Sequence, residues 1–182
     1  RQRQMCIRDS DIARQKIERE ISMGKVVVIA GFQGGTEDGE ITTLGRGGSD
    51  TSAVAIGKAL GSKTVQIYTD VDGIMTADPR VEPDARIIKF IEYEEVFQMA
   101  EQGSKVIHPR AVELAKKADI ILEIKNTLNP NYEGTKIGSI KNLDYGNGDY
   151  EEEGRFVSAV AHKNNIAQIK VKSPEKFQML RN

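Results

Sequence analysis

The segment VVVIAGFQGGTEDGEITTLGRGGSDTSAVAIGKALG, residues 26–61, holds an apolar run, a glycine-rich turn and an alanine-rich run in that order. The β-branched residues of 26–32 predict a strand that is buried on both faces, as strands of parallel sheets are. The alanine-rich residues predict a helix over 49–60, which Gly61 ends. A strand, a turn and a helix in this succession indicate an α/β unit.

The same alternation continues on both sides of this segment. Upstream, a helix over 11–23 is predicted to place Ile12, Ile17 and Ile21 on one face and to end at Gly24. The other predicted elements are a short strand at 40–44, buried strands at 65–71 and 120–126, and helices at 93–103 and 109–119. Helices that alternate with buried strands predict a layered α/β fold with a largely parallel sheet.

The composition divides the chain into parts. Residues 141–154 are polar, acidic and contain glycine, and we interpret them as a linker that follows a main domain over 11–140. Residues 155–182 predict a strand, a turn, a second strand and the start of a helix. They are too few to bury a core alone, so we expect them to open a second, α+β domain. Residues 1–10 match no predicted element and are expected to be a non-native leader.

Charge and composition exclude several classes of partner. The net charge is -1 at pH 7, with 38% hydrophobic and 29% charged residues, as in a soluble globular protein. This balance gives no reason to expect nucleic acid or an anionic membrane as a partner. No apolar run reaches the roughly 20 residues that span a bilayer. The single cysteine, Cys6, forms no internal disulfide, which fits a reducing cytoplasm.

The turn TLGRGGSD offers a binding site for an anion. Gly45, Gly47 and Gly48 would let a ligand approach the backbone, and the helix that follows begins with N–H groups that favour negative charge. Arg46 adds a planar fork suited to a carboxylate or a phosphate. The alternative is a tight turn with a capped helix and a solvated arginine.

Two further polar loops contain candidate ligand-binding residues. In YTDVDGIMTADPR, 68–80, Thr69 and Asp70 end a predicted strand where a ribose, a base or a magnesium-bound phosphate would lie, and Arg80 would reach phosphate oxygens. The alternative is a structural loop in which Asp78 caps a turn. In EQGSKVIHPR, 101–110, Lys105 would point to the same sheet edge.

The histidines indicate no catalytic centre. His108 precedes a proline and is interpreted as a structural or capping residue rather than a base. His162 has no partner in the sequence. No spacing of residues resembles a zinc site or a nucleophile triad, so no metal ligands are predicted.

These motifs, in this order, closely resemble the aspartate kinases of the amino-acid kinase superfamily. The resemblance runs from about Ile12 to Ile140 and rests on GRGGSDTSA, TDVDG with TADPR, and GSKVIHPRAVELA. GRGGSDTSA is the most specific motif, because related kinases of glutamate, acetylglutamate, carbamate or UMP carry other residues there. The resemblance implies a three-layer αβα sandwich, here incomplete.

The resemblance also implies roles for individual residues. Arg46 would bind a carboxylate of aspartate, Gly47, Gly48 and Ser49 would line its pocket, and Asp50 would organise the reaction centre together with a lysine from the N-terminal part of the enzyme. The implied nucleotide contacts are Thr69, Asp70, Met75, Arg80, Lys105 and Val106, with Met75 near the adenine.

The implied reaction transfers the γ-phosphoryl group of ATP, with Mg²⁺, to the side-chain carboxylate of L-aspartate. The product is 4-phospho-L-aspartate, a precursor of lysine, threonine and methionine. The family's Lys-Phe-Gly-Gly-Thr-Ser loop does not occur in this sequence, so we expect the chain to be an inactive fragment. FVSAVAHKNNIAQIKVKSPEKF resembles the opening of an ACT regulatory domain, which implies a lysine or threonine effector and a homo-oligomeric, cytoplasmic parent.

Two other functions remain open at this stage. The chain would be a non-catalytic regulatory subunit if it paired with a complete catalytic chain, although it keeps the substrate turn and little of the ACT-like region. It would be another amino-acid kinase, such as a glutamate 5-kinase, if glutamate competed with aspartate.

Overall fold

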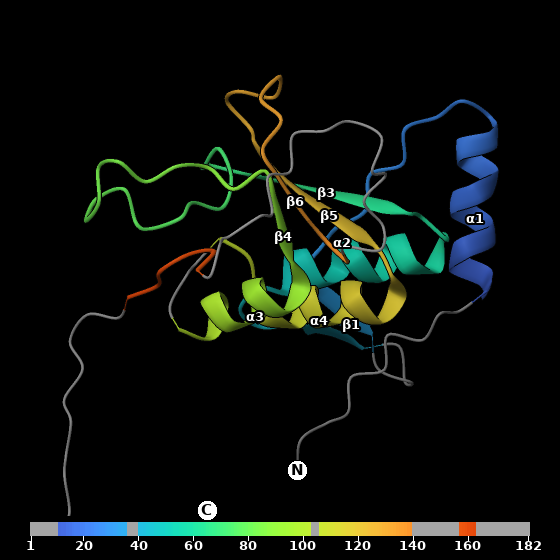
Figure 1. Ribbon diagram of the computed structural model, residues 1–182. Helices are drawn as coiled ribbons and strands as arrows, with labels where there is room; N and C mark the ends of the chain where they lie inside the picture. Colours follow the sequence, from blue (N-terminus) through green and yellow to red (C-terminus); the bar gives the residue numbers. More distant parts are fainter. Residues whose placement is uncertain (1–10, 36–39, 103–105, 140–156, 163–182) are drawn as a thin grey trace, which may run out of the picture.

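The computed structural model of the chain describes residues 11–35, 40–102, 106–139 and 157–162 (Figure 1). The predicted leader, the predicted linker and residues 163–182 lie outside the described residues. The helices and strands are α1 (Asp11–Ser22), β1 (Gln33–Gly35), β2 (Ile41–Thr43), α2 (Gly48–Ala59), β3 (Thr64–Thr69), β4 (Phe90–Glu92), α3 (Tyr93–Glu101), α4 (Pro109–Ala118), β5 (Ile121–Asn126) and β6 (Thr135–Gly138).

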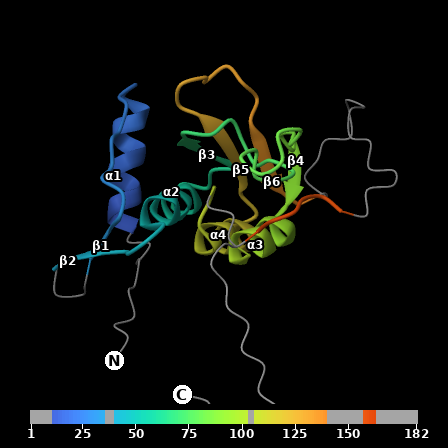
Figure 2. The same cartoon turned by 90° about the vertical axis from the view of Figure 1, so that its left-hand side faces the viewer.

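A four-stranded sheet organises the described part of the chain. Its strand order is β3-β5-β6-β4, with β3 parallel to β5, β4 parallel to β6, and β5 antiparallel to β6. The predicted α/β fold with a largely parallel sheet is therefore confirmed. Helices α2, α3 and α4 cover one face of this sheet (Figures 1 and 2). The described elements include the sheet and this one covering layer of the predicted three-layer sandwich.

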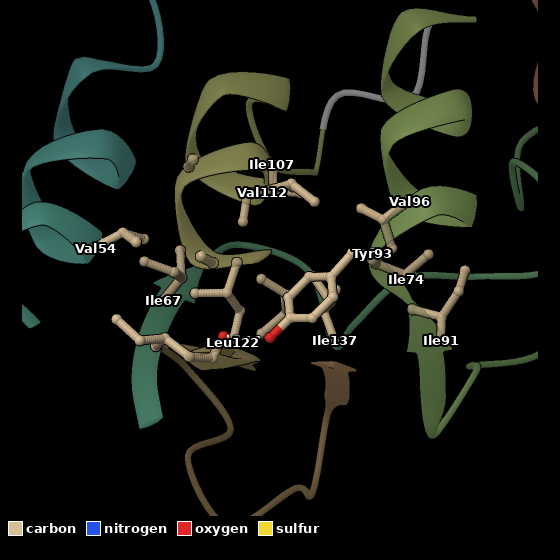
Figure 3. Close-up of a cluster of buried hydrophobic side chains, with 14 of the residues drawn as sticks. Val54, Ile67, Ile74, Ile91, Tyr93, Val96, Ile107, Val112, Leu122 and Ile137 are labelled. Atoms are coloured by element: carbon tan, nitrogen blue, oxygen red, sulfur yellow. Dashed lines mark hydrogen bonds between the residues drawn. The ribbon is translucent and has the colours of Figure 1, made fainter. Parts of the chain in front are cut away.

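The core lies between the sheet and the three helices. Leu122, Ile124 and Ile137 from the strands are fully buried, as are Val54 of α2 and Val112 of α4. Figure 3 shows these helices and strands contributing side chains to one cluster. Each Å² of apolar surface that this cluster buries stabilises the fold by about 25 cal/mol.

The strand β3 is not buried on both faces, contrary to the prediction. Val65 and Ile67 pack toward the core, whereas Gln66 is exposed and Tyr68 is 50% exposed. Side chains alternate between the two faces of a strand, and among the described residues the helices cover only one face. The outer face is therefore polar: the Gln66 amide donates a 2.8 Å hydrogen bond to Glu123 of β5.

Residues 26–32 do not form the predicted buried strand. Residues 25–30 have no regular structure, and Val26 and Val28 are each 91% exposed. A β-branched run indicates a tendency toward strand, but the strand forms only where a neighbour supplies hydrogen bonds and apolar cover. Among the described elements, none pairs with this run.

Most other predicted elements are confirmed within one or two residues. The helix α1 forms, and on its predicted apolar face Ile17 is half-buried and Ile21 is 50% exposed. The sequence missed β1, β4 and β6, because strands of three or four residues are too short to show a periodic pattern.

Residues 157–162 form no strand, although the sequence predicted one there. They lie beside α3 (Figure 2). The Ser158 hydroxyl donates to Glu95 of α3, and the backbone N–H of Val160 donates a 2.8 Å hydrogen bond to Thr76. The segment therefore packs on the main domain without extending its sheet.

Tyr93→Phe should lower the free energy of unfolding by about 1–2 kcal/mol, because the buried Tyr93 hydroxyl donates to the Ile120 carbonyl at 2.8 Å and that carbonyl would lose its partner. Burial, with the nearby Asp119 charge, raises the pKa of Tyr93 from 10.0 to about 12. Its protonated form thus stabilises the fold below pH 10, and this contribution is lost as pH rises toward 12.

Urea unfolding of the wild-type chain and of Tyr93→Phe from pH 7 to 12 measures the loss of stability and its dependence on pH. The control is Tyr132→Phe on an exposed tyrosine, which should change stability by less than about 0.5 kcal/mol. Equal losses of stability in Tyr93→Phe and Tyr132→Phe would contradict a stabilising role of the Tyr93 hydrogen bond.

Candidate active site

The turn between β2 and α2 contains the predicted anion site. Its closing hydrogen bond runs from the Gly48 N–H to the Gly45 carbonyl at 3.0 Å. Gly47 caps α2 with φ 71°, a left-handed conformation that glycine adopts without steric cost. The Gly47 carbonyl accepts hydrogen bonds from both the N–H and the hydroxyl of Thr51. The glycines of this turn are therefore required by its geometry.

Ser52 ties the turn to the preceding segment. Its hydroxyl donates to the Gly48 carbonyl at 2.8 Å and accepts from the Phe32 N–H at 3.1 Å. The Phe32 carbonyl in turn accepts from the Leu44 N–H at 2.9 Å. The sequence-based interpretation did not include Ser52, and its place in the first turns of a helix after a glycine turn was the only signal for it.

The side chains best suited to ligand binding are accessible. Arg46 and Ser49 are exposed, and Asp50 is half-buried in the first turn of α2. Among the described residues, no side chain pairs with Arg46 or accepts a hydrogen bond from it. The first turn of a helix also leaves backbone N–H groups without intrahelical partners. A guanidinium and these N–H groups can together bind a carboxylate or a phosphate.

The third predicted loop meets this turn. His108 caps α4, and its Nδ1 accepts a hydrogen bond from the Arg110 N–H at 3.3 Å, so the capping interpretation is confirmed. The same side chain lies against Gly47, where a Cβ would collide with the imidazole. Val106 is half-buried against the core, and Lys105 lies outside the described residues.

The second predicted loop begins at the carboxyl end of β3. Thr69 is paired with Asn126 at the end of the parallel strand β5, and its hydroxyl donates to Asp70 at 3.2 Å. The Asn126 amide donates to Asp72 at 2.7 Å, which holds the loop to the sheet edge. Asp70 is exposed there and is accessible to a ligand. In open α/β sheets this edge is where ligands bind.

Met75 and Arg80 lie farther along this loop, which extends beyond the sheet (Figure 1). Met75 is half-buried and forms an antiparallel bridge with Ile87. Arg80 is 87% exposed and forms two side-chain hydrogen bonds to Asp78, at 3.0 and 2.7 Å. Asp78 also accepts from the Arg80 backbone N–H at 2.9 Å, so the predicted capping by Asp78 is confirmed. Arg80 is thus oriented by Asp78 within the loop.

Arg80→Ala should raise the pKa of the Asp78 carboxyl toward its ordinary value of 3.8. The side-chain hydrogen bonds from Arg80, followed by the one from its backbone, lower that pKa to about 2. The ionised carboxylate therefore stabilises the loop above pH 3.8, and this contribution is lost as pH falls through 2. Carboxyl carbon NMR measures the titration, and an unchanged midpoint in the variant would contradict the assignment.

No metal site stands out in the part of the chain that the structure describes. There, no group of three or more histidine, cysteine, aspartate or glutamate side chains could hold an ion. Among the described helices, none is both long and apolar enough to cross a membrane.

Comparison with known proteins finds one family over most of the chain. A model of the amino acid kinase family matches residues 2–126. Aspartokinase from Rickettsia felis is 43% identical over 158 residues, which cover 86% of this chain and 37% of that protein. The chain thus spans little more than a third of that relative's length.

Solved structures resemble the fold as well. E. coli aspartokinase III in complex with aspartate and ADP superposes with a TM-score of 0.65 at 36% identity, over 71% of this chain and 29% of that one. The same enzyme in complex with lysine and aspartate gives a TM-score of 0.64 at 36% identity, over 72% of this chain and 30% of that one.

Proposed function

The chain belongs to the amino acid kinase family, and on this premise we propose that it carries the aspartate site and part of the nucleotide site of an aspartokinase. The reaction is transfer of the γ-phosphoryl group of ATP to the side-chain carboxylate of L-aspartate, giving 4-phospho-L-aspartate. The observation that carries the proposal is Arg46, an exposed guanidinium in a glycine turn at the start of α2. The relative solved with aspartate and ADP supports it.

The aspartate site consists of the turn and the first residues of α2. Arg46 binds a carboxylate of the substrate through paired N–H groups, which fix its orientation. Gly47 and Gly48 form the backbone of the turn that lines the substrate pocket, and Ser49 offers a hydroxyl at the pocket wall. Asp50, half-buried in the same turn of helix, orders the polar groups around the reacting carboxylate.

The nucleotide site lies along the loop after β3. Thr69 and Asp70 contact the nucleotide at the sheet edge, Met75 provides an apolar contact near the adenine, and Arg80 binds phosphate oxygens. Lys105 and Val106 complete this set. Phosphoryl transfer depends mainly on positioning and on neutralising charge, so the oriented Arg80 would contribute directly.

The residues present are suited to Mg²⁺ that binds together with the nucleotide. Mg²⁺ in kinases is bound mainly by substrate phosphates and waters with one or two carboxylates, and such a site needs no cluster of three protein ligands. Asp70, exposed at the end of β3, is the carboxylate best placed for this role. The ion would neutralise charge on the transferred group.

The regulatory part of the proposal concerns residues 155–182. We assign them to an ACT-like domain that follows a linker at 141–154, and we assign the parent to a cytoplasmic homo-oligomer. Lysine is the first effector to test, because the E. coli relative was solved in complex with it. The proposed pathway is the biosynthesis of lysine, threonine and methionine.

Binding and turnover are tested separately, because the chain spans 37% of its Rickettsia relative. In an NMR titration of the ¹⁵N-labelled chain, L-aspartate should shift the amides of residues 46–50, and L-glutamate at equal concentration should not. ADP with Mg²⁺ should shift residues 69–80. An aspartyl-hydroxamate assay with MgATP measures turnover. Equal binding of glutamate, or shifts outside residues 46–50, would overturn the proposed substrate.

A further inference from the structure

His108 occupies the space where a side chain at position 47 would lie. A Cβ placed on Gly47 would collide with the Cβ, Cγ and Cδ2 atoms of His108. The imidazole therefore packs directly against the α-carbon of Gly47, across 61 positions of sequence. The His108 ring therefore contacts the substrate turn at Gly47.

The ring is itself held in place by the start of α4. Its Nδ1 accepts from the Arg110 N–H, and the His108 carbonyl accepts from the Ala111 N–H at 3.0 Å. Ala111 and Val112 are buried in the core. Pro109, at the first position of the helix, fixes the backbone that follows the histidine. The support under Gly47 is thus anchored in the core.

The next residue of the turn, Gly48, is also closely packed. A Cβ on Gly48 would lie 2.6 Å from the Cβ of Leu44 and 2.8 Å from a ring carbon of Phe32. Gly47 is therefore packed against His108, and Gly48 is packed against the Leu44 and Phe32 side chains. Displacing the imidazole would remove the contact at Gly47 and leave the contacts at Gly48 intact.

We propose that His108 is a positioning residue for the substrate turn. Its ring holds Gly47 in the left-handed conformation that directs Arg46 and the first N–H groups of α2 toward one ligand. The proposal rests on the proposed function in one respect, the assignment of L-aspartate as that ligand. The carboxylates of the loop after β3 accept hydrogen bonds within that loop and from Asn126 of β5 rather than from His108, so the ADP-induced shifts of residues 69–80 should not depend on His108.

Two variants distinguish the contribution of the His108 ring from that of the helix cap. His108→Asn keeps a side-chain acceptor for the first turn of α4 but removes the ring, since asparagine is a favoured N-cap. His108→Phe keeps a ring against Gly47 but removes the acceptor, which should lower the unfolding temperature. If His108 only stabilises the fold, aspartate affinity should fall in the variant that is less stable. If His108 positions the turn, aspartate affinity should fall in the variant that lacks the ring.

The experiment titrates the wild-type chain and both variants with L-aspartate and with ADP, and records thermal unfolding. We expect His108→Asn to bind aspartate about tenfold more weakly with the ADP-induced shifts of residues 69–80 unchanged, because a displaced positioning group weakens only the ligand that it aligns. His108→Phe should bind aspartate within about twofold of wild type and unfold at a lower temperature. A folded His108→Asn chain with wild-type aspartate affinity would overturn the proposal.

A ligand-free measurement separates this proposal from the proposed function. The amide shifts and hydrogen exchange of Arg46, Gly47 and Gly48 should change in His108→Asn and stay near wild type in His108→Phe. If the wild-type chain binds no aspartate, the proposed function fails, and these amides still decide the role of His108. Unchanged amides in His108→Asn would overturn that role.

Discussion

Arg46→Ala should weaken the binding of L-aspartate by about 100-fold. The guanidinium is exposed and unpaired within the described part of the chain, so its hydrogen-bonding capacity is available to the ligand. Hydrogen bonds to charged groups contribute about 1.5–3 kcal/mol, and 1.4 kcal/mol corresponds to a factor of ten. The measurement is the dissociation constant of L-aspartate from NMR or calorimetric titration, with ADP binding followed in parallel.

Two control variants separate geometry from charge. Arg46→Lys keeps the charge but loses the planar fork, so it should recover only part of the affinity. Arg19→Ala removes an equal charge from an exposed position on α1 and should leave binding unchanged. If Arg46→Ala and Arg19→Ala weakened binding equally, the effect would come from net charge rather than from a contact in the turn.

Gly134→Ala should reduce the free energy of unfolding by about 2–5 kcal/mol, the sum of a left-handed backbone penalty and a steric one. Gly134 precedes β6 with φ 74°, and a Cβ there would collide with the carbonyl oxygen of Ile124. That oxygen belongs to the backbone of β5, an inner strand that pairs with β6, and Ile124 is fully buried. The strand cannot move aside without disturbing the sheet.

Gly61→Ala provides the matched control for this substitution. Gly61 has a similar φ of 66°, but a Cβ there would meet no atom within 4 Å. Its cost should therefore be limited to the backbone penalty of about 1–2 kcal/mol. Urea unfolding of both variants gives the comparison. Equal losses would show that the collision at Gly134 is relieved by a small local shift.

Much of the fold was predictable because the signals for it are local. The apolar spacing of α3 and α4, the glycine after α2 and the β-branched residues of β3 and β5 each lie within one element. The substrate turn was also recognisable, because its glycines and Arg46 are adjacent in the sequence. The pairing of strands was harder to predict, because β4 and β6 are short and their register depends on residues 46 positions apart, such as Phe90 and Lys136.

Side-chain environments depended on contacts between distant segments. The pattern at 26–32 indicated burial, but Val26 and Val28 are exposed because no described element covers them. This outcome is set by which groups lie nearby in space, which a periodic pattern does not encode.

By itself the sequence determined the α/β class, the principal helices and strands, and the chemistry of the turn at Arg46, because these follow from local propensity and from neighbouring residues. Only the tertiary structure decided which face of the sheet is covered and that His108 lies beneath Gly47. Those features arise from packing between residues far apart in the chain, where the shape of one segment limits the space left for another.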